Sequence, residues 1–164
     1  KGLNQMRRKI YRGRYTTAVS EEEFAVFIIG LRINRLLTFW KWLPVFNAMS
    51  PMIRELYENR HLGFLHVEFF FSWRRITLIQ YWQGFDHLVN YAHQEKHVTA
   101  WKAFNQKIKD NGSVGVFHET YQIKQGSFEA VYNHMPTIGL AKAFTHVPVS
   151  KQTTTAKKRM GFKT

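Results

Sequence analysis

Two of the eight histidines stand where they could do chemistry, namely His97 and His118. His97 lies four residues before Trp101, so in a helix the two side chains share one face. His118 lies in a predicted strand, on the same side as Val116 and Thr120. A neutral imidazole at either position can act as a general base or ligate iron. Both also have structural explanations, since His97 can be a polar residue near a helix start and His118 can form a hydrogen bond across a dimer.

Arg32 and Asn34 are the candidate groups for holding an anion. Both lie at the end of a predicted strand and share a face with Gly30, whose missing side chain leaves room for something bulky. An arginine at the rim of a pocket can hold a carboxylate or a propionate through paired hydrogen bonds. A contact between strands, or the capping of a helix, is the structural alternative, and the sequence does not choose between them.

Aromatic side chains are the candidates for lining a cavity that binds a planar ligand. They are Tyr81, Trp82, Trp101, Phe104 and Tyr121. Aromatic residues at these spacings also build ordinary cores. The spacing of the remaining scattered histidines does not predict a zinc site, so we expect no metal other than a haem iron.

Other classes of catalytic site lack their motifs. The chain has no Gly-x-Ser-x-Gly, no His-Glu-x-x-His and no dinucleotide-binding glycine pattern after a strand. It also has no cysteine, which excludes disulfides, thiolate metal sites and a cysteine nucleophile. Hydrolase and dehydrogenase activities are therefore not predicted.

The positive charge lies mostly toward the two ends of the chain. The net charge is +13, with six Lys/Arg in residues 1–23 and five in residues 149–164. Residues 24–148 hold 13 Lys/Arg against eight Asp/Glu, a net charge of +5. This distribution predicts a basic N-terminal extension (1–23), one domain (24–148) and a basic C-terminal tail (149–164). Such ends are usually solvated tails, so we expect no nucleic-acid partner.

The elements that must position these residues alternate in a simple order. The pattern predicts strand, helix, strand, strand, helix, strand, with a short strand appended. The predicted ranges are strand 24–34, helix 39–60 with a kink at Pro51, strands 63–72 and 76–83 in a hairpin, helices from Gly84 and from His97, strand 113–123 and strand 128–132. This order is typical of an α+β, ferredoxin-like split βαβ subunit.

No apolar run approaches the roughly 20 residues that span a bilayer. The basic start of the chain is followed by polar residues where a signal peptide needs an apolar stretch. We therefore expect a cytoplasmic protein without a membrane partner.

Several short motifs together resemble one known family. They are Gly30-Leu-Arg-Ile-Asn34, Lys41-Trp-Leu-Pro-Val-Phe46, Gln80-Tyr-Trp82, Ala100-Trp-Lys-Ala-Phe-Asn105, Val114-Gly-Val-Phe-His-Glu-Thr-Tyr121 and Glu129-Ala-Val-Tyr132 with Met135-Pro136. Residues 24–148 resemble a family of monooxygenase-like domains of unknown function in the dimeric α+β-barrel superfamily, whose best-known members are antibiotic-biosynthesis monooxygenases. His134 departs from the expected pattern beside Met135-Pro136.

The resemblance implies a homodimer in which two four-stranded sheets form a barrel, with a pocket between each sheet and its helices. It also implies three chemistries, because relatives in the superfamily oxygenate polycyclic or phenolic molecules without a cofactor, bind or degrade haem, or dehydrate aldoximes on haem. Fold alone does not choose among them.

The function that we predict is a monooxygenase-like enzyme that acts on a small hydrophobic or aromatic molecule without a cofactor. His97 or His118 would be the base, and Arg32 and Asn34 would steady the substrate anion. One alternative is a haem enzyme of the same fold, with His97 or His118 as the axial ligand. Another is a non-enzymatic dimeric module whose basic tails bind an anionic partner.

Overall fold

The computed structural model describes residues 9–37, 40, 51–108 and 112–161, without the side chains of residues 96, 100, 104, 107 and 108. The chain divides into two compact units, which we describe separately. The larger unit is Glu23–Gln122, and the smaller unit combines Lys1–Glu22 with Ile123–Thr164.

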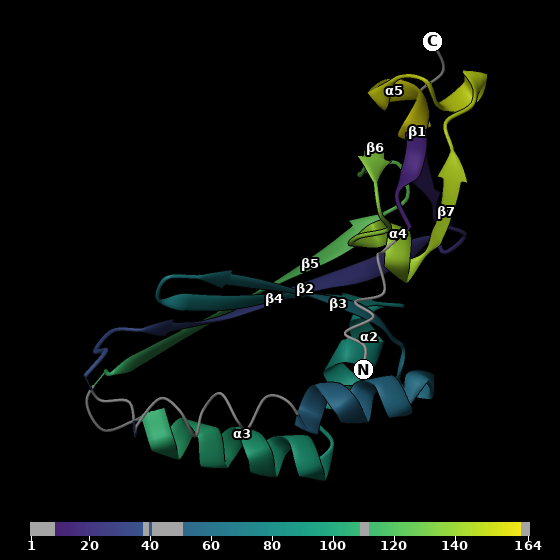
Figure 1. Ribbon diagram of the computed structural model, residues 1–164. Coiled ribbons are helices and arrows are strands. Elements are labelled where there is room, and N and C mark those ends of the chain that lie inside the picture. Colours follow the sequence, from purple (N-terminus) through teal and green to yellow (C-terminus); the bar gives the residue numbers. More distant parts are fainter. Residues whose placement is uncertain (1–8, 38–39, 41–50, 109–111, 162–164) are drawn as a thin grey trace, which may run out of the picture. The chain divides into compact units, whose positions relative to one another are not determined.

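The larger unit has the predicted order of elements. Along the chain these are β2 (Glu23–Ile33), a helical segment at residues 51–58, η1 (Arg60–Leu62), β3 (Phe64–Ser72), β4 (Arg75–Trp82), α2 (Phe85–Ala92), α3 (Glu95–Ile108) and β5 (Val114–Lys124). The strands form one sheet in the order β3-β4-β2-β5 (Figure 1). This is the strand order of a ferredoxin-like split unit, so the predicted α+β fold class is confirmed.

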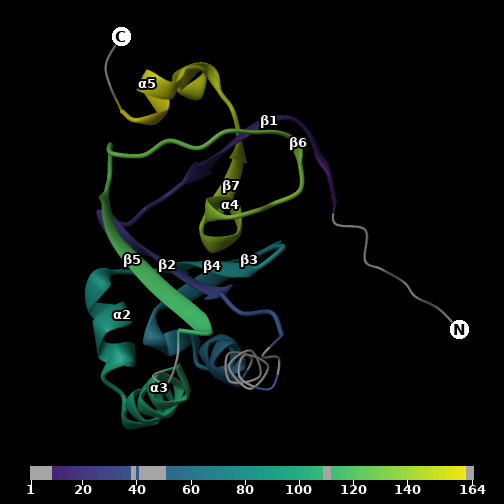
Figure 2. The same ribbon diagram turned by 90° about the vertical axis from the view of Figure 1, so that its left-hand side faces the viewer.

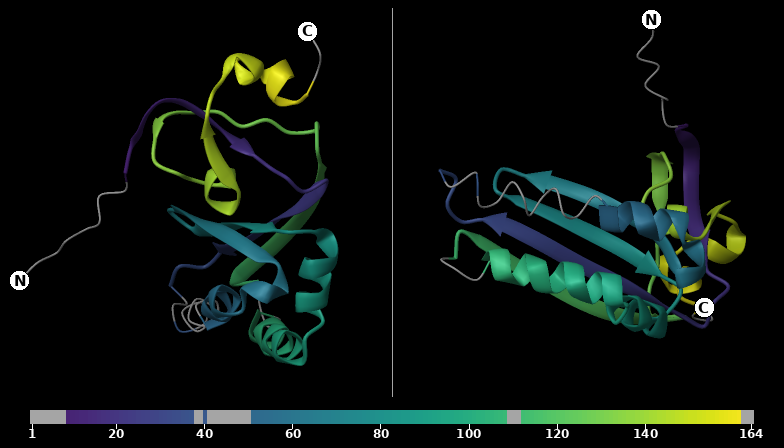
Figure 3. Two further views of the ribbon diagram at one scale, coloured as in Figure 1. Left: turned by 90° about the vertical axis from the view of Figure 1, so that its right-hand side faces the viewer. Right: turned by 90° about the horizontal axis from the view of Figure 1, so that it is seen from below.

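The described helices of this unit lie on one face of the sheet (Figures 2 and 3). Cross-strand register explains which side chains meet them, because directly opposed residues share a face. Phe27 pairs with Gln80 and Ile29 pairs with Leu78, and all four line the space beneath the helices. The buried cluster at this face includes Trp82, whose side chain is fully buried.

The boundaries of the helices differ slightly from the predicted ones. Helix α2 starts as predicted, with Gly84 in extended conformation as its N-cap. Helix α3 starts at Glu95, two residues before the predicted His97, and its acidic first residue favours the helix N-terminus. Of the predicted helix 39–60 only residues 40 and 51–58 are described as helical, and residues 109–111 of the predicted turn lie outside the described residues.

The smaller unit contains a three-stranded sheet in the order β6-β1-β7. Its elements are β1 (Tyr11–Ala18), β6 (Tyr132–Met135), α4 (Leu140–Ala143), β7 (Thr145–Pro148), η2 (Lys151–Thr153) and α5 (Ala156–Arg159). The predicted strand 128–132 is wrong, because β6 begins only at Tyr132 and pairs with β1. The basic ends, expected as solvated tails, carry regular structure throughout much of their described length.

Aromatic packing explains why the N-terminal segment is folded. The ring of His146 stacks on Tyr15 at 4.5 Å and meets Tyr11 at 4.7 Å between ring centroids. The buried hydroxyl of Thr16 donates to the carbonyl of Ala130 at 2.7 Å. The predicted boundary at 23/24 lies within one residue of a boundary between the compact units, whereas the second boundary of the units is at 122/123 and not at 148/149.

Candidate functional site

A cavity of about 560 Å³ lies between the sheet and the helices of the larger unit. Strands β2, β4 and β5 provide one wall, and α2, α3 and residues 52–56 provide the other. The lining is predominantly apolar. Four of the predicted site residues line this cavity, namely Trp82, His97, Trp101 and His118.

His97 is held by a hydrogen bond that defines its tautomer. Its Nδ1 lies 3.1 Å from the carbonyl oxygen of Ala92, at the end of α2. Because a carbonyl oxygen only accepts, Nδ1 must carry the proton, and Nε2 of the neutral ring keeps its lone pair. The ring also contacts Tyr91, at 4.8 Å between centroids. A fixed ring with a free Nε2 suits a general base or a metal ligand.

His118 is held less firmly than His97. Its ring lies 5.7 Å from that of Phe27, and its side chain is exposed. Among the described residues it has no hydrogen-bond partner. Of the two predicted histidines, His97 is therefore the one whose ring position and tautomer are set by the fold.

Gln80 is a polar cavity residue that our sequence reasoning missed as a site residue. The Nε1–H of Trp82 donates to Gln80 Oε1 at 3.0 Å. Because an indole N–H only donates, the amide oxygen must face Trp82 and the NH₂ group must point elsewhere. Within the described part of the chain that NH₂ group has no partner. The sequence signal for Gln80 was its spacing, because it lies two residues after Leu78 and two before Trp82 and therefore on the same inward face of the strand.

Tyr91 is the second residue that was missed. Its side chain is only 5% exposed, lines the cavity and contacts the rings of Trp82 and His97. Its hydroxyl is buried and, within the described structure, has no hydrogen-bond partner. Burial, and secondarily the charge of Glu55, raises the pKa of Tyr91 to about 12, so the hydroxyl stays protonated near neutral pH. The available signal was its position three residues after Leu88, on the buried side of α2.

Arg32 and Asn34 lie elsewhere than in this cavity. Arg32 Nη1 donates to Asn34 Oδ1 at 3.0 Å, and the Asn34 amide donates to the carbonyl of Gly112 at 3.0 Å. The space above Gly30 is filled by Phe117, because a Cβ on Gly30 would lie 2.1 Å from its ring. The structure therefore supplies the inter-strand explanation that the sequence left open, and the bulky neighbour is a side chain of the protein.

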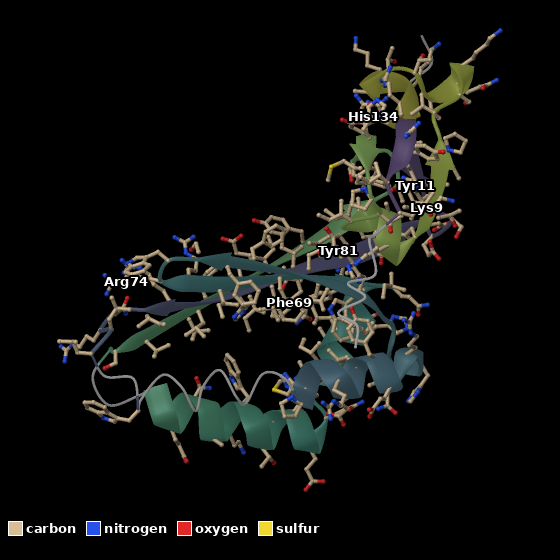
Figure 4. All side chains as sticks on the ribbon, in the orientation of Figure 1. Lys9, Tyr11, Phe69, Arg74, Tyr81 and His134 are labelled. Atoms are coloured by element: carbon tan, nitrogen blue, oxygen red, sulfur yellow. The ribbon has the colours of Figure 1, made fainter. Side chains whose placement is uncertain are left out.

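Tyr81 and Tyr121 lie on the face of the sheet away from the helices. Figure 4 shows Tyr81 on that side and Phe69 on the opposite side. The Tyr81 ring stacks on His66 at 6.4 Å. The Tyr121 hydroxyl donates to Glu119 at 2.8 Å, and this bond raises the pKa of Tyr121. The predicted site residue Phe104 has its side chain outside the described residues.

His134, which departs from the family pattern, belongs to β6 of the smaller unit. Its Nδ1 accepts a long hydrogen bond, 3.5 Å, from the backbone N–H of Gly13. The described residues contain no group of three or more His, Cys, Asp or Glu placed to hold a metal ion. Nor does any described helix have the length and apolar character needed to cross a membrane.

Residues 24–140 match the family described as Monooxygenase af470-like. The chain belongs to this family. The resemblance seen in the sequence motifs is thereby confirmed. A relative, monooxygenase af470 of Aspergillus fumigatus, is 29% identical over 118 residues, which cover 65% of this chain. The match covers 41% of that relative, so the chain spans less than half the length of the curated protein.

Two solved structures are similar to this chain at low sequence identity. An aldoxime dehydratase, OxdRE in complex with butyraldoxime, matches with a TM-score of 0.57 and 11% identity, over 99% of this chain and 46% of that one. SnoaB, a cofactor-independent oxygenase from Streptomyces nogalater, matches with a TM-score of 0.43 and 13% identity, over 63% and 95% of the two chains. The likeness to the aldoxime dehydratase supports the fold alone.

Proposed function

We propose that this chain is a monooxygenase-like oxidoreductase that binds a small hydrophobic molecule with an aromatic or polycyclic skeleton. The observation that carries this proposal is an apolar cavity lined by His97, whose Nε2 keeps its lone pair, and by Gln80 and Tyr91. The Gln80 amide NH₂ and the Tyr91 hydroxyl have no hydrogen-bond partner among the described residues. Membership of the monooxygenase-like family supports the reaction class. The size and the aromatic lining of the cavity support the class of substrate.

The proposed reaction needs no bound cofactor. His97 Nε2 takes a proton from an acidic CH₂ group of the substrate, and the resulting carbanion passes one electron to O₂. The two radicals combine to a peroxide, which is protonated and loses water to leave a carbonyl group. One oxygen atom enters the product and the other leaves as water, so the substrate supplies all four electrons.

Gln80 and Tyr91 stabilise the substrate anion, which is the role that the sequence suggested for Arg32 and Asn34. When the substrate loses its proton, negative charge moves onto an oxygen atom conjugated with the carbanion. The free NH₂ of Gln80 and the protonated hydroxyl of Tyr91 are donors that can stabilise this charge in a site with little water. Trp82 and Trp101 line the cavity and keep water out.

The experiment that tests this function uses anthrone, a tricyclic ketone with an acidic CH₂ group, and an oxygen electrode. We expect oxygen uptake with formation of the quinone, and a loss of 100-fold or more in His97→Ala, the range for removing a general base. His93→Ala is the matched control, because His93 Nδ1 also donates to a helix carbonyl, that of Val89, but its side chain is exposed and outside the cavity lining. Full turnover in His97→Ala would contradict the proposed base.

Haem binding is the second candidate, and the same hydrogen bond favours it. Metal-ligating histidines usually donate their second ring N–H to a carbonyl or carboxylate, as His97 does. His97 would ligate the iron, and Lys102, the one cationic residue among the described cavity-lining residues, would bind a propionate. Haem, when bound, supplies iron redox chemistry. Titration with hemin tests this candidate: a Soret band that is lost in His97→Ala and kept in His93→Ala would identify the ligand.

We also propose that the larger unit self-associates as a homodimer through the sheet face that its helices leave open. The family resemblance and the half-buried apolar residues on that face, among them Ile28 and Ile79, support this proposal. A cytoplasmic location stays a prediction.

A further inference from the structure

The end of the sheet formed by the β3–β4 turn and the end of β2 carries the three most exposed large apolar side chains among the described residues. These are Leu37 (88%), Trp73 (86%) and Phe71 (73%). Leu36, 40% exposed, adjoins Leu37. We call these four residues, together with Arg32 and Arg75, the sheet-end patch.

Backbone contacts bring the two segments of this patch together. Ile33 N–H donates to the carbonyl of Arg74 at 2.7 Å, and Arg74 Nε donates to the carbonyl of Ile33 at 2.9 Å. The Arg74 guanidinium also donates to the carbonyl of Asn34. Figures 1 and 3 show both segments at one end of the sheet, and Figure 4 shows Arg74 there. The hydrogen bonds of Arg74 hold the two segments together. Arg32 and Arg75 are opposite each other in the strand register, and both side chains are exposed.

The charge of the patch has one sign. The described residues 31–37, 71–78 and 112–116, which meet at this end, include several arginines and no carboxylate. The strand register places Arg32 and Arg75 on the sheet face opposite Phe71, so the arginines and the apolar side chains lie side by side at the end of the sheet and not around one another. Apolar and aromatic side chains next to arginines, without acidic residues in these segments, match the boundary of an anionic bilayer, where acyl chains take up the former and headgroups the latter. A contact between two copies of the patch is disfavoured, because a two-fold axis would bring arginines against arginines.

We propose that the sheet-end patch docks this protein on the surface of an anionic lipid membrane. The side chains of Leu37, Phe71 and Trp73 enter the headgroup–acyl boundary, and Arg32 and Arg75 contact lipid phosphates. Leu31 lines the cavity and directly precedes Arg32, so the docked end is also one end of the cavity. Docking on a membrane differs from our expectation of no membrane partner. It does not depend on the proposed reaction, because the patch would bind lipid whichever chemistry the cavity performs.

The test is co-sedimentation of the full chain with vesicles of phosphatidylcholine alone and with 30% phosphatidylglycerol. We expect binding to the anionic vesicles, reduced at least tenfold in the double variant Leu37→Ser/Trp73→Ser. The single variants Arg32→Gln and Arg75→Gln should each bind the anionic vesicles about fivefold more weakly than the wild type. Circular dichroism checks that each variant is folded.

Two controls separate this patch from other features of the chain. Ile10→Ser removes an exposed apolar residue of the smaller unit, and Lys151→Gln/Lys157→Gln removes two of its exposed cations. Both variants should bind anionic vesicles as the wild type does. The proposal is overturned if the wild type does not bind anionic vesicles, or if Leu37→Ser/Trp73→Ser binds them as the wild type does. Sedimentation velocity tests whether the patch is instead an interface between copies. If the wild type is a dimer that does not bind vesicles, and Leu37→Ser/Trp73→Ser is a monomer, the patch is such an interface and the proposal is overturned.

Discussion

At the scale of single residues, three polar side chains that line the cavity keep hydrogen-bonding groups without a partner in the described part of the chain. His97 donates through Nδ1 and keeps Nε2, while Gln80 accepts through its oxygen and keeps its NH₂ group. The Tyr91 hydroxyl forms no hydrogen bond to any described residue. A buried polar group without a partner costs about 1–3 kcal/mol of folding free energy. Such a cost in an apolar cavity is explained if a ligand supplies the missing partner.

Tyr91→Phe tests this explanation because it separates stability from binding. Removing an unpartnered buried hydroxyl should leave the free energy of unfolding unchanged or raise it by about 1 kcal/mol. Binding of anthrone, followed by quenching of tryptophan fluorescence, should weaken about fivefold to tenfold because one donor to the ligand is lost. Tyr11→Phe, in the smaller unit, is the control and should change neither quantity. A fall in stability of more than 1 kcal/mol in Tyr91→Phe would mean that the hydroxyl has a partner in the fold.

Alkaline unfolding gives a second measurement on Tyr91. Burial raises its pKa from 10.0 in the unfolded chain to about 12, so between these values the folded protein holds a proton that the unfolded chain has lost. The stabilisation from this group is therefore complete below pH 10 and is lost as the pH rises toward 12. We expect the free energy of unfolding to fall by about 1–2 kcal/mol more in the wild type than in Tyr91→Phe across this range. Parallel curves for the two proteins would contradict the raised pKa.

The residue types of the site were partly predictable from the sequence. His97 and Trp101 were placed together because helical spacing fixes their common face, and Trp82 and His118 also line the cavity. Arg32 was misplaced because a strand exposes alternate residues to opposite faces, and the sequence alone does not tell which face the helices cover.

At the scale of elements, the turn at Gly63 positions helix α2 against the sheet. Gly63 has a φ of 85° and caps η1. A Cβ there would lie 2.3–2.7 Å from three side-chain atoms of His87, on the first turns of α2. The carbonyl of Gly63 also accepts from the backbone N–H of Gln83, just before α2, at 2.8 Å. The start of α2, and with it Tyr91, therefore depends on a residue without a side chain.

Gly63→Ala should accordingly destabilise the protein by about 2–4 kcal/mol, from the left-handed backbone and from the displaced His87. Gly112→Ala is the matched control, because Gly112 also has a positive φ, 65°, but no atom of a described residue lies within 4 Å of its Cβ position. It should cost only about 1–2 kcal/mol. Urea denaturation of both variants measures the difference, and equal losses would show that contact with His87 contributes nothing.

The elements of the larger unit were predictable because each carries its own local signal, such as the apolar strand 24–31 and the hairpin of β3 and β4. The smaller unit was not, because β1 pairs with strands more than 100 residues later and the strands β6 and β7 have only four residues each. A short strand gives little periodic signal, and pairing at that sequence distance leaves none in the local pattern.

At the scale of the whole molecule, the two units differ sharply in charge. Residues 1–22 and 123–164 hold 13 Lys/Arg against three Asp/Glu, whereas residues 23–122 hold 11 against eight. The net charges are therefore +10 and +3. The sequence predicted that this charge lies near the two ends of the chain, but it did not predict that the two ends fold together into one unit. Contact of that unit with an anionic partner stays a prediction.

The sheet face that the helices leave open is the proposed dimer interface. Cross-strand register places Ile28 opposite Ile79 on that face, and Phe117 and Tyr121 of β5 are exposed. If two copies pack through it, as the family resemblance implies, a two-fold axis brings the same residues of both copies together. Ile79→Arg would then bury like charges against each other, and we expect a dimer of the wild type to become monomeric in sedimentation velocity, with an unchanged circular dichroism spectrum.

The matched control is Gln122→Arg, which places the same charge at an exposed position of β5 whose side chain alternates to the other side of the strand. This variant should stay dimeric, because its arginine remains in solvent. A dimer that persists in Ile79→Arg would place the interface elsewhere. Since Ile79 is not part of the sheet-end patch, Ile79→Arg should also keep vesicle binding, so that loss of the dimer and loss of membrane docking are separate results.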